Sequence, residues 1–315
     1  MTKHLICHSV YTPIEEVAGN PIQGLDGVEL LTGYEPVDAS FLDLSTSVHL
    51  PYATDWYAAW TGVRKVSDDI PDEDVRYLFY GREKKDIINN LKLAMDNATV
   101  VDPAYAVLHA CNANLDEILA YDYSDDDEKI LSVFIEMVNE VISLFPNGEP
   151  PFKILFENLW WPGLKMLDDK GFRLIEKKIE FENWGLCLDT GHLMVSTKRS
   201  REEKSSIQIL ERIFENYPKE MIDRIITMHL HQNTSADFMK TYSRDPNYLR
   251  LGTIDRLNVA YGYIFKMDEH RPFTLKEATH LVDIIKPKYV THEMGAVDIL
   301  ARIRDFKQQR ALFQK

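Results

Sequence analysis

Short apolar runs alternate with longer amphipathic segments along almost the whole chain. The short runs are rich in Val, Ile, Leu and aromatic residues and are bounded by turn-forming residues, which is the pattern of buried strands. They predict strands at residues 4–10, 26–31, 46–50, 104–109, 153–158, 184–189, 224–230 and 288–293.

The segments between these runs carry apolar residues at spacings of three and four, which is the period of an amphipathic helix. The pattern is weak after the first two strands, where "PIEEVAG" (13–19) predicts a short helix and "YEPVDASFL" (34–42) scarcely supports one. Ser124, followed by a run of acids, is the predicted N-cap of the second long helix. The long helices are predicted at residues 83–98, 126–145, 202–217, 275–285 and 296–313.

Strands that alternate with helices build a parallel sheet whose faces are covered by the helices. Eight such units in about 300 residues is the number found in a (β/α)8 TIM barrel. We therefore predict an α/β protein with a single TIM-barrel domain over residues 1–315. A doubly wound open sheet is the alternative, but the turn after the first strand, "CHSVYTPIEE", lacks the Gly-rich phosphate loop typical of that class.

Two connections are longer than a barrel needs. Residues 51–81, after the third predicted strand, are rich in aromatic and charged side chains, and residues 231–271, after the seventh, show little clear periodicity. Loops of this length in a compact domain are usually functional. Both follow strand ends on the face where barrels hold their active sites, so we expect them to cover the site.

The composition is that of a globular protein, with 45% hydrophobic and 27% charged residues. No apolar run approaches the roughly 18 residues needed to cross a bilayer. The N-terminal "MTKHLICHSVY" lacks the features of a secretory signal. Cys7, Cys111 and Cys187 are far apart and form no CxxC motif, which fits reduced thiols and predicts a cytoplasmic location.

The net charge of −14 narrows the range of partners. A protein that binds a nucleic-acid backbone usually carries a basic stripe, and this chain has no run of four basic residues. We therefore expect no binding to nucleic acid or to an anionic membrane. A small-molecule substrate is the expected partner.

Six of the eight predicted strands finish at a side chain that can bind a metal ion. His, Asp and Glu make up roughly one residue in five of the chain, so chance does not readily supply six such ends. Barrel strands point their carboxyl ends at one shared mouth, so these side chains are expected to converge there. They are His49, His109, Glu157, Asp189, His229 and Glu293.

The chemistry of this set favours a divalent metal. A carboxylate at the end of an apolar strand is costly to bury unless it is paired or bound to a cation. Imidazole and carboxylate without thiolate favour Mn, Zn, Fe, Co or Mg. For His49 and His229, a hydrogen-bonded core position is the alternative interpretation. In "GLCLDTGHLM" (185–194), Gly191 is expected to allow a tight turn that directs His192 into the same pocket.

Six sequence blocks resemble, in order, the xylose isomerase-like TIM barrel superfamily, and the resemblance extends from about residue 4 to 310. That superfamily unites sugar and sugar-phosphate isomerases and epimerases with apurinic-site endonucleases. The resemblance implies an eight-stranded barrel with a divalent metal at its mouth. The blocks are "SVHLP", "VLHA", "LFENLWWPG", "CLDTGHLM", "MHLHQN" and "THEM".

The isomerase and epimerase branch of this superfamily implies one metal ion and an acid/base pair. Its pattern places the ion on Glu157, Asp189, His229 and Glu293, and the two glutamates also exchange the substrate proton. A homo-oligomer is compatible with the resemblance, because barrels of this group often associate.

The endonuclease branch implies more ions. It adds His49 and His109 as ligands and makes Glu157 a bridge between two metals. It completes a third metal with His192 and an Asp-x-His unit that shortly precedes a Leu-Gly. In "SRDPNYLRLGTID" (243–255), Tyr248 stands where that His is expected and Asp245 is shifted by one position, so a complete three-metal cluster is not expected.

Our first functional hypothesis is isomerisation or epimerisation of a sugar or sugar phosphate, which the resemblance favours. A divalent ion would polarise the carbonyl, and Glu157 and Glu293 would remove and return the proton. His192 is expected to steady a substrate hydroxyl. The residues expected to contact the substrate are Trp56, Trp60, Trp160 and His231, although packing beneath the loops is the alternative for the tryptophans.

The alternative hypothesis is metal-dependent hydrolysis of a phosphoester in a small metabolite, as in the cobamide-remodelling hydrolases that the superfamily includes. It requires His49 and His109 as true ligands, with Glu157 shared between two metals. A third interpretation, a barrel that only binds ligands, is opposed by the complete acidic set, which would be destabilising without a cation.

Overall fold

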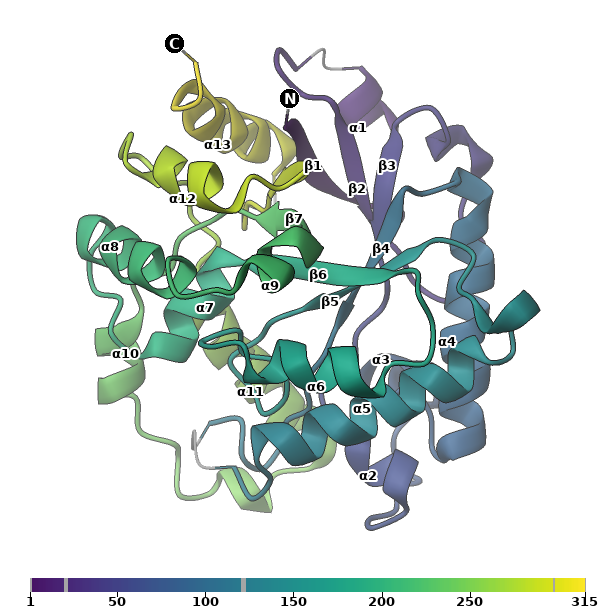
Figure 1. The fold of residues 1–315 in the computed structure, drawn as a ribbon. Coiled ribbons are helices and arrows are strands. Elements are labelled where there is room, and N and C mark those ends of the chain that lie inside the picture. The colour runs from purple at the N-terminus through teal and green to yellow at the C-terminus, as the bar shows by residue number, and fades with distance from the viewer. Residues whose placement is uncertain (1, 20–21, 120–122, 297, 315) are drawn as a thin grey trace.

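The computed structural model describes residues 2–19, 22–119, 123–296 and 298–314. Within them, eight parallel strands pair in chain order and close into a barrel, because β1 is hydrogen-bonded to both β2 and β8. The barrel occupies the centre of Figure 1 with helices around it, which confirms the predicted fold class. The strands are β1 (Lys3–Ser9), β2 (Gly27–Leu31), β3 (Ser45–His49), β4 (Tyr105–His109), β5 (Lys153–Glu157), β6 (Trp184–Asp189), β7 (Ile225–His229) and β8 (Tyr289–His292).

The five predicted long helices are present. They are α4 (Lys84–Ala98), α5 (Asp127–Ile142), α8 (Glu203–Phe214), α12 (Ala278–Ile285) and α13 (Ile299–Ala311). Residue 297, which falls in the helix predicted at 296–313, lies outside the described residues. The N-cap of α5 is Asp126 rather than Ser124, because the Asp126 carboxylate accepts the Lys129 N–H at 2.7 Å.

Short helices fill the remaining connections, as the weak patterns after the first two strands predict. They are α1 (Glu15–Ala18), α2 (Tyr57–Thr61), α3 (Asp72–Phe79), α7 (Thr190–Thr197), α9 (Lys219–Arg224) and α10 (Ala236–Thr241), with 3-10 turns η1 (Ala39–Phe41), η2 (Thr99–Val101), η3 (Pro146–Gly148) and η4 (Tyr248–Arg250).

Two of the longer helices, α6 (Lys170–Lys178) and α11 (Thr253–Met267), are not predicted by the sequence pattern. The α6 helix buries only Phe172 and Ile175, so its apolar stripe is short. The α11 helix buries a regular stripe but also exposes apolar side chains such as Phe265, which is 76% exposed. Apolar residues on both faces obscure the helical period.

The apolar core has two parts. The larger part lies between the strands and the surrounding helices, where, for example, the rings of Phe134 on α5 and Phe156 on β5 are 5.7 Å apart. A smaller cluster lies inside the barrel and consists of Leu5, Tyr105, Val107, Leu155, Cys187 and Tyr289. These interior residues all have odd numbers, because side chains on a strand alternate between its two faces. The same alternation directs the strand ends described below.

Both long connections contain helices. The first carries α2 and α3, and the second carries α10, η4 and α11. In Figure 1, α2, α10 and α11 lie in the lower half of the molecule, away from both chain termini. In the described part of the chain, no helix combines the length and the apolar character that crossing a bilayer requires.

Candidate metal centre

The strand register brings the predicted metal-binding side chains together at the mouth of the barrel. His109 at the end of β4 is paired with Glu157 at the end of β5, and Asp189 at the end of β6 is paired with His229 at the end of β7. These residues continue the odd-numbered series, so all of them face the barrel axis. Glu293 directly follows β8, which ends one residue earlier than the sequence predicts.

Cluster 1 consists of His49, His109 and Glu157, from three adjacent strands. Glu157 Oε2 lies 3.1 Å from His49 Nε2 and 3.2 Å from His109 Nε2. The other ring nitrogen of His49 contacts the Leu50 carbonyl oxygen at 2.8 Å. This contact leaves Nε2 of His49 to face the cluster.

Cluster 2 consists of Glu157, Asp189, His229 and Glu293 and lies beside cluster 1. His229 Nδ1 lies 3.3 Å from Glu157 Oε1, 3.1 Å from Glu293 Oε2 and 3.7 Å from Asp189 Oδ2. The two carboxylate oxygens of Glu157 therefore face different clusters. Glu157 could contribute a ligand atom to an ion in each of them.

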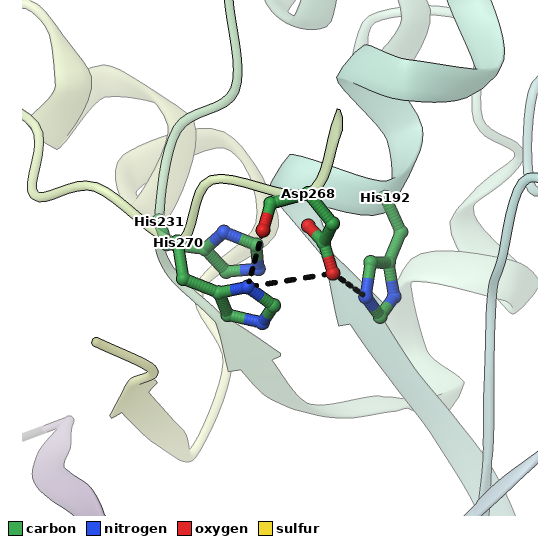
Figure 2. Close-up of side chains that lie close together, drawn as sticks. All are labelled: His192, His231, Asp268 and His270. Carbon is green, nitrogen blue, oxygen red and sulfur yellow. Dashed lines mark hydrogen bonds and ion pairs between the residues drawn. The ribbon is translucent and has the colours of Figure 1, made fainter. Parts of the chain in front are cut away.

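Cluster 3 consists of His192, His231, Asp268 and His270. Figure 2 shows Asp268 between His192 on one side and the stacked rings of His231 and His270 on the other. Asp268 Oδ2 lies 3.4 Å from His192 Nε2 and 3.4 Å from His270 Nδ1. His192 comes from the first turn of α7, and Asp268 and His270 directly follow α11.

Cluster 3 contains an Asp-x-His unit, Asp268-Glu269-His270. The stretch around Asp245 and Tyr248, which the resemblance aligned with such a unit, belongs to none of the clusters. Tyr248 is buried elsewhere, and its hydroxyl donates to the Leu115 carbonyl oxygen at 2.9 Å. The sequence feature that could have pointed to Asp268 and His270 is their Asp-x-His spacing. They lie at the end of the connection 231–271, in which no helix or strand was predicted.

Asn233, in the "HLHQN" block, fixes the position of this Asp-x-His unit. Its side-chain amide donates to Asp268 Oδ1 at 2.7 Å, and its side-chain oxygen accepts the backbone N–H groups of Glu269 and His270. His270 has a positive φ of 47°, which is uncommon for a residue with a side chain. These hydrogen bonds hold His270 in a backbone conformation that it would rarely adopt unaided.

Hydrogen bonds between Asn158 and Asp189 link the ends of β5 and β6. The Asn158 side chain donates to the Asp189 carbonyl oxygen at 3.0 Å and accepts the Asp189 N–H at 2.8 Å. The Asp189 carboxylate caps α7 by accepting the His192 N–H at 2.6 Å, and its other oxygen contacts His231 Nε2 at 2.8 Å. The carboxylate is therefore fixed at both oxygens.

Gly191 has a different role from the tight turn that the sequence suggests. It lies in the first turn of α7 and is not among the glycines with positive φ. A Cβ at this position would overlap the imidazole ring of His231. The glycine therefore makes room for His231 rather than bending the chain.

Carboxylates and imidazoles in the clusters stabilise one another's charged forms. Burial alone would raise the pKa of Glu157, but His229 and His109 hold that pKa well below its usual range. Burial opposes the charged form of Glu293 as well, but His229 and His270 hold its pKa well below its usual range. Both glutamates are therefore ionised at neutral pH, which is the form that binds a cation.

Three atoms of cluster 2 indicate directly that these residues fit a metal ion. Glu157 Oε1, His229 Nδ1 and Glu293 Oε2 are buried and have no aligned hydrogen-bond partner among the described residues. Buried polar atoms are otherwise almost always hydrogen-bonded. Because the three atoms converge at 3.1–3.3 Å around His229 Nδ1, one cation could satisfy all of them.

The charges of the site are also consistent with bound cations. In the described part of the chain, every ion pair of its four carboxylates is made with a histidine and none with lysine or arginine. These carboxylates are Glu157, Asp189, Asp268 and Glu293. Buried anions without fixed cations are strongly destabilising, so the ligand set is consistent with divalent metal. Burial raises the pKa of the nearby Cys187 thiol well above its usual range, so this residue stays neutral.

Two of the tryptophans proposed to bind substrate lie in packing contacts. Trp56 is fully buried, and its indole N–H donates to the Cys111 carbonyl oxygen at 2.7 Å. Trp60 is also buried, with the Lys84 ammonium 4.4 Å from its ring centroid. These contacts correspond to the packing alternative for loop tryptophans.

The other two residues proposed to bind substrate adjoin the clusters. The Trp160 ring lies 5.1 Å from the His192 ring, and the Trp160 indole N–H is buried without a hydrogen-bond partner among the described residues. His231 belongs to cluster 3 itself. Sequence reasoning gave less attention to Tyr52, which is 45% exposed and stacks on His109 with ring centroids 4.6 Å apart.

Comparison with known proteins supports the fold and leaves the reaction open. No family model matches the sequence, and no curated protein matches it. The structure is similar to a D-tagatose 3-epimerase-like protein, with a TM-score of 0.56 and 17% identity over 99% of this chain and 96% of that one. It is also similar to endonuclease IV from Thermus thermophilus, with a TM-score of 0.54 and 10% identity over 99% of this chain and 98% of that one. At these identities the likenesses show the fold alone, which is the closed eight-stranded parallel barrel that the sequence predicts.

The three clusters lead us to expect three divalent ions per chain. His270→Ala should remove one of them, because cluster 3 loses a ligand. Asp245→Asn should retain all three, because Asp245 belongs to none of the clusters. Elemental analysis by mass spectrometry after dialysis would measure the ion content. Loss of an ion from Asp245→Asn but not from His270→Ala would contradict this assignment.

Gly191→Ala should destabilise the protein by about 1–3 kcal/mol, because the added methyl group displaces the buried His231 ring. The matched control is Gly262→Ala in α11, where a new Cβ meets nothing within 4 Å. That change should leave stability unaltered or raise it by up to about 1 kcal/mol, since alanine favours a helix. Urea unfolding of both variants would test the comparison, and equal stabilities would show that the His231 ring does not need this space.

Proposed function

We propose that this protein is a metal-dependent hydrolase that cleaves a phosphoester bond in a small metabolite. The observation that carries the proposal is the presence of three adjacent clusters, two of which share Glu157. An isomerase that moves one proton needs only the ligands of cluster 2. It does not need the other cluster members as metal ligands: His49, His109, His192, His231, Asp268 and His270.

The exposure of the ligands indicates where a substrate enters. The side chain of Glu157 is 1% exposed and that of His229 is 0% exposed, whereas the side chains of Glu293 and His270 are 20% and 21% exposed. His109 is 12% exposed, beside the accessible Tyr52 ring. The open side of the site is therefore bounded by Glu293, His270 and His109, and we place the substrate phosphate there.

When bound, divalent ions would supply Lewis acidity to the phosphoryl oxygens and to the attacking water. Glu293 is the carboxylate that can reach that water, because it is ionised and partly exposed. We assign to it the acceptance of the water proton. His109 and His270 border the phosphate position, and Tyr52 offers a flat apolar face to the remainder of the substrate.

Glu157 is poorly placed for proton transfer to a substrate. It is buried, with one oxygen facing His49 and His109 and the other facing His229. A glutamate that is committed on both oxygens is suited to bridging ions. This weakens the mechanism in which two glutamates exchange a substrate proton.

We infer a small substrate rather than nucleic acid from the charge. A net charge of −14 opposes binding to a phosphate backbone. Endonuclease IV shares only the fold with this chain at 10% identity. A single phosphoester group needs local charge compensation alone, which the ions of the clusters would supply.

Epimerisation of a sugar or sugar phosphate remains the second candidate. Cluster 2 alone offers four ligands, which suffice for one ion, and it places the carboxylates of Glu157 and Glu293 at 3.3 and 3.1 Å from His229 Nδ1. A ligand set of this kind can polarise a carbonyl and acidify the adjacent C–H group. The proposal is therefore tested against this reaction.

The hydrolase proposal is tested with p-nitrophenyl phosphate and bis(p-nitrophenyl) phosphate in ¹⁸O-labelled water. We expect metal-dependent release of nitrophenol, with one solvent oxygen entering the phosphate product. Glu293→Gln should lower kcat/KM by about 10²–10⁴-fold, because the proton acceptor is lost. Asp245→Asn, in the same long connection as cluster 3, is the control and should retain activity.

Epimerisation predicts a different isotope result. In D₂O, an epimerase would incorporate deuterium at the carbon next to the carbonyl of a ketohexose or its phosphate, and Glu293→Gln would abolish this exchange. We expect no such incorporation. Deuterium uptake that depends on Glu293, together with a single ion per chain, would replace the hydrolase proposal with epimerisation.

A further inference from the structure

Glu29, on β2, is a fully buried carboxylate inside the barrel that belongs to none of the three clusters. Its Oε1 lies 2.8 Å from Nε2 of His229. The contact lacks the alignment of a hydrogen bond, and neither atom forms a hydrogen bond to any group in the described ranges. Oε1 of Glu29 and Nε2 of His229 face each other at ion-pair distance.

Three hydroxyl groups fix the other oxygen of Glu29. Its Oε2 accepts hydrogen bonds from Ser47 on β3 at 3.0 Å, from Tyr105 on β4 at 3.0 Å and from Thr291 on β8 at 3.3 Å. All three donors are buried. The carboxylate is thus held by side chains from three strands, and its free oxygen is directed at the imidazole.

The two nitrogens of His229 face opposite directions. Nδ1 faces Glu157 and Glu293 in cluster 2, whereas Nε2 faces Glu29. A neutral imidazole that binds an ion through Nδ1 must carry its proton on Nε2. A carboxylate beside Nε2 stabilises that tautomer and makes the ligating nitrogen more basic.

We propose that Glu29 is a positioning residue for the metal centre, which fixes the tautomer and the ring orientation of His229 and thereby strengthens ion binding in cluster 2. The inference rests on cluster 2 binding an ion, which both candidate reactions require. It extends the site below the layer of direct ligands, into the barrel interior.

Stability alone does not readily explain why a carboxylate, that of Glu29, is buried inside the barrel. The barrel interior also holds an apolar cluster that includes Val107 and Leu155. Within the described residues, the only ion pair of Glu29 is with His229. A well-packed apolar side chain usually serves the stability of such a position at least as well as a buried carboxylate.

The test measures Zn²⁺ affinity by competition with a chromogenic chelator, and the coordination of cluster 2 by the visible absorption of the Co²⁺ protein. Glu29→Gln, which keeps the shape and removes the charge, should weaken binding of one ion by about tenfold, and Glu29→Ala by up to about 100-fold. Both should alter the Co²⁺ spectrum. Val107→Ala, in the apolar cluster inside the barrel, is the control and should lower the melting temperature without changing affinity or spectrum.

A second variant covers the case in which both Glu29 variants fail to fold. Ser47→Ala removes one hydrogen bond to Glu29 without contacting His229 and should weaken ion binding by about two- to fivefold. Folded Glu29 variants, or Ser47→Ala, that bind Zn²⁺ like the wild-type protein would overturn the role of Glu29 alone. A wild-type protein that binds no divalent ion would overturn the metal centre and, with it, this inference.

Discussion

The structure depends on one electrostatic constraint, the burial of several carboxylates at the barrel mouth without lysine or arginine beside them. Glu157 and Asp189 are fully buried, and in the described part of the chain histidines are the only cationic side chains paired with them. Removing such charges from water costs several kcal/mol for each group unless cations and hydrogen bonds compensate. The ten side chains of the three clusters are therefore best explained as a place for metal ions. The pairing of carboxylates with imidazoles in these clusters keeps Glu157 and Glu293 ionised.

In the rest of the fold, the residues that stabilise the barrel are different from those of the three clusters. The larger apolar cluster lies between the strands and the helices, so the side chains at the strand ends can be arranged for binding rather than for packing. A shell of hydrogen bonds then fixes them. Asn158 joins the ends of β5 and β6, and Asn233 holds the Asp268-His270 turn. These amides contribute to the site although neither is itself a ligand.

The choice between epimerisation and phosphoester hydrolysis depends on which glutamate is exposed to water and on whether one glutamate belongs to two clusters. An epimerase and a phosphoester hydrolase can use the same four residues of cluster 2, and this explains why a fold shared with both kinds of protein does not discriminate between them. The buried position of Glu157 between two clusters favours a bridge, whereas the partial exposure of Glu293 favours contact with water. The number of ions that the chain holds is therefore the property that separates the two classes.

The sequence alone predicted the barrel and the six side chains of the first two clusters, because strand periodicity fixes which strand-end side chains point inward at the mouth. His49, His109, Glu157, Asp189, His229 and Glu293 are all expected there, and the structure brings them together. Only the tertiary structure identified Asp268 and His270, since their position depends on side-chain hydrogen bonds from Asn233 and not on any repeating pattern. It also showed that Gly191 makes room for His231, and that Trp56 packs in the core. Contacts between segments distant in the chain leave no periodic signal in the sequence, so they become visible only when the chain is folded.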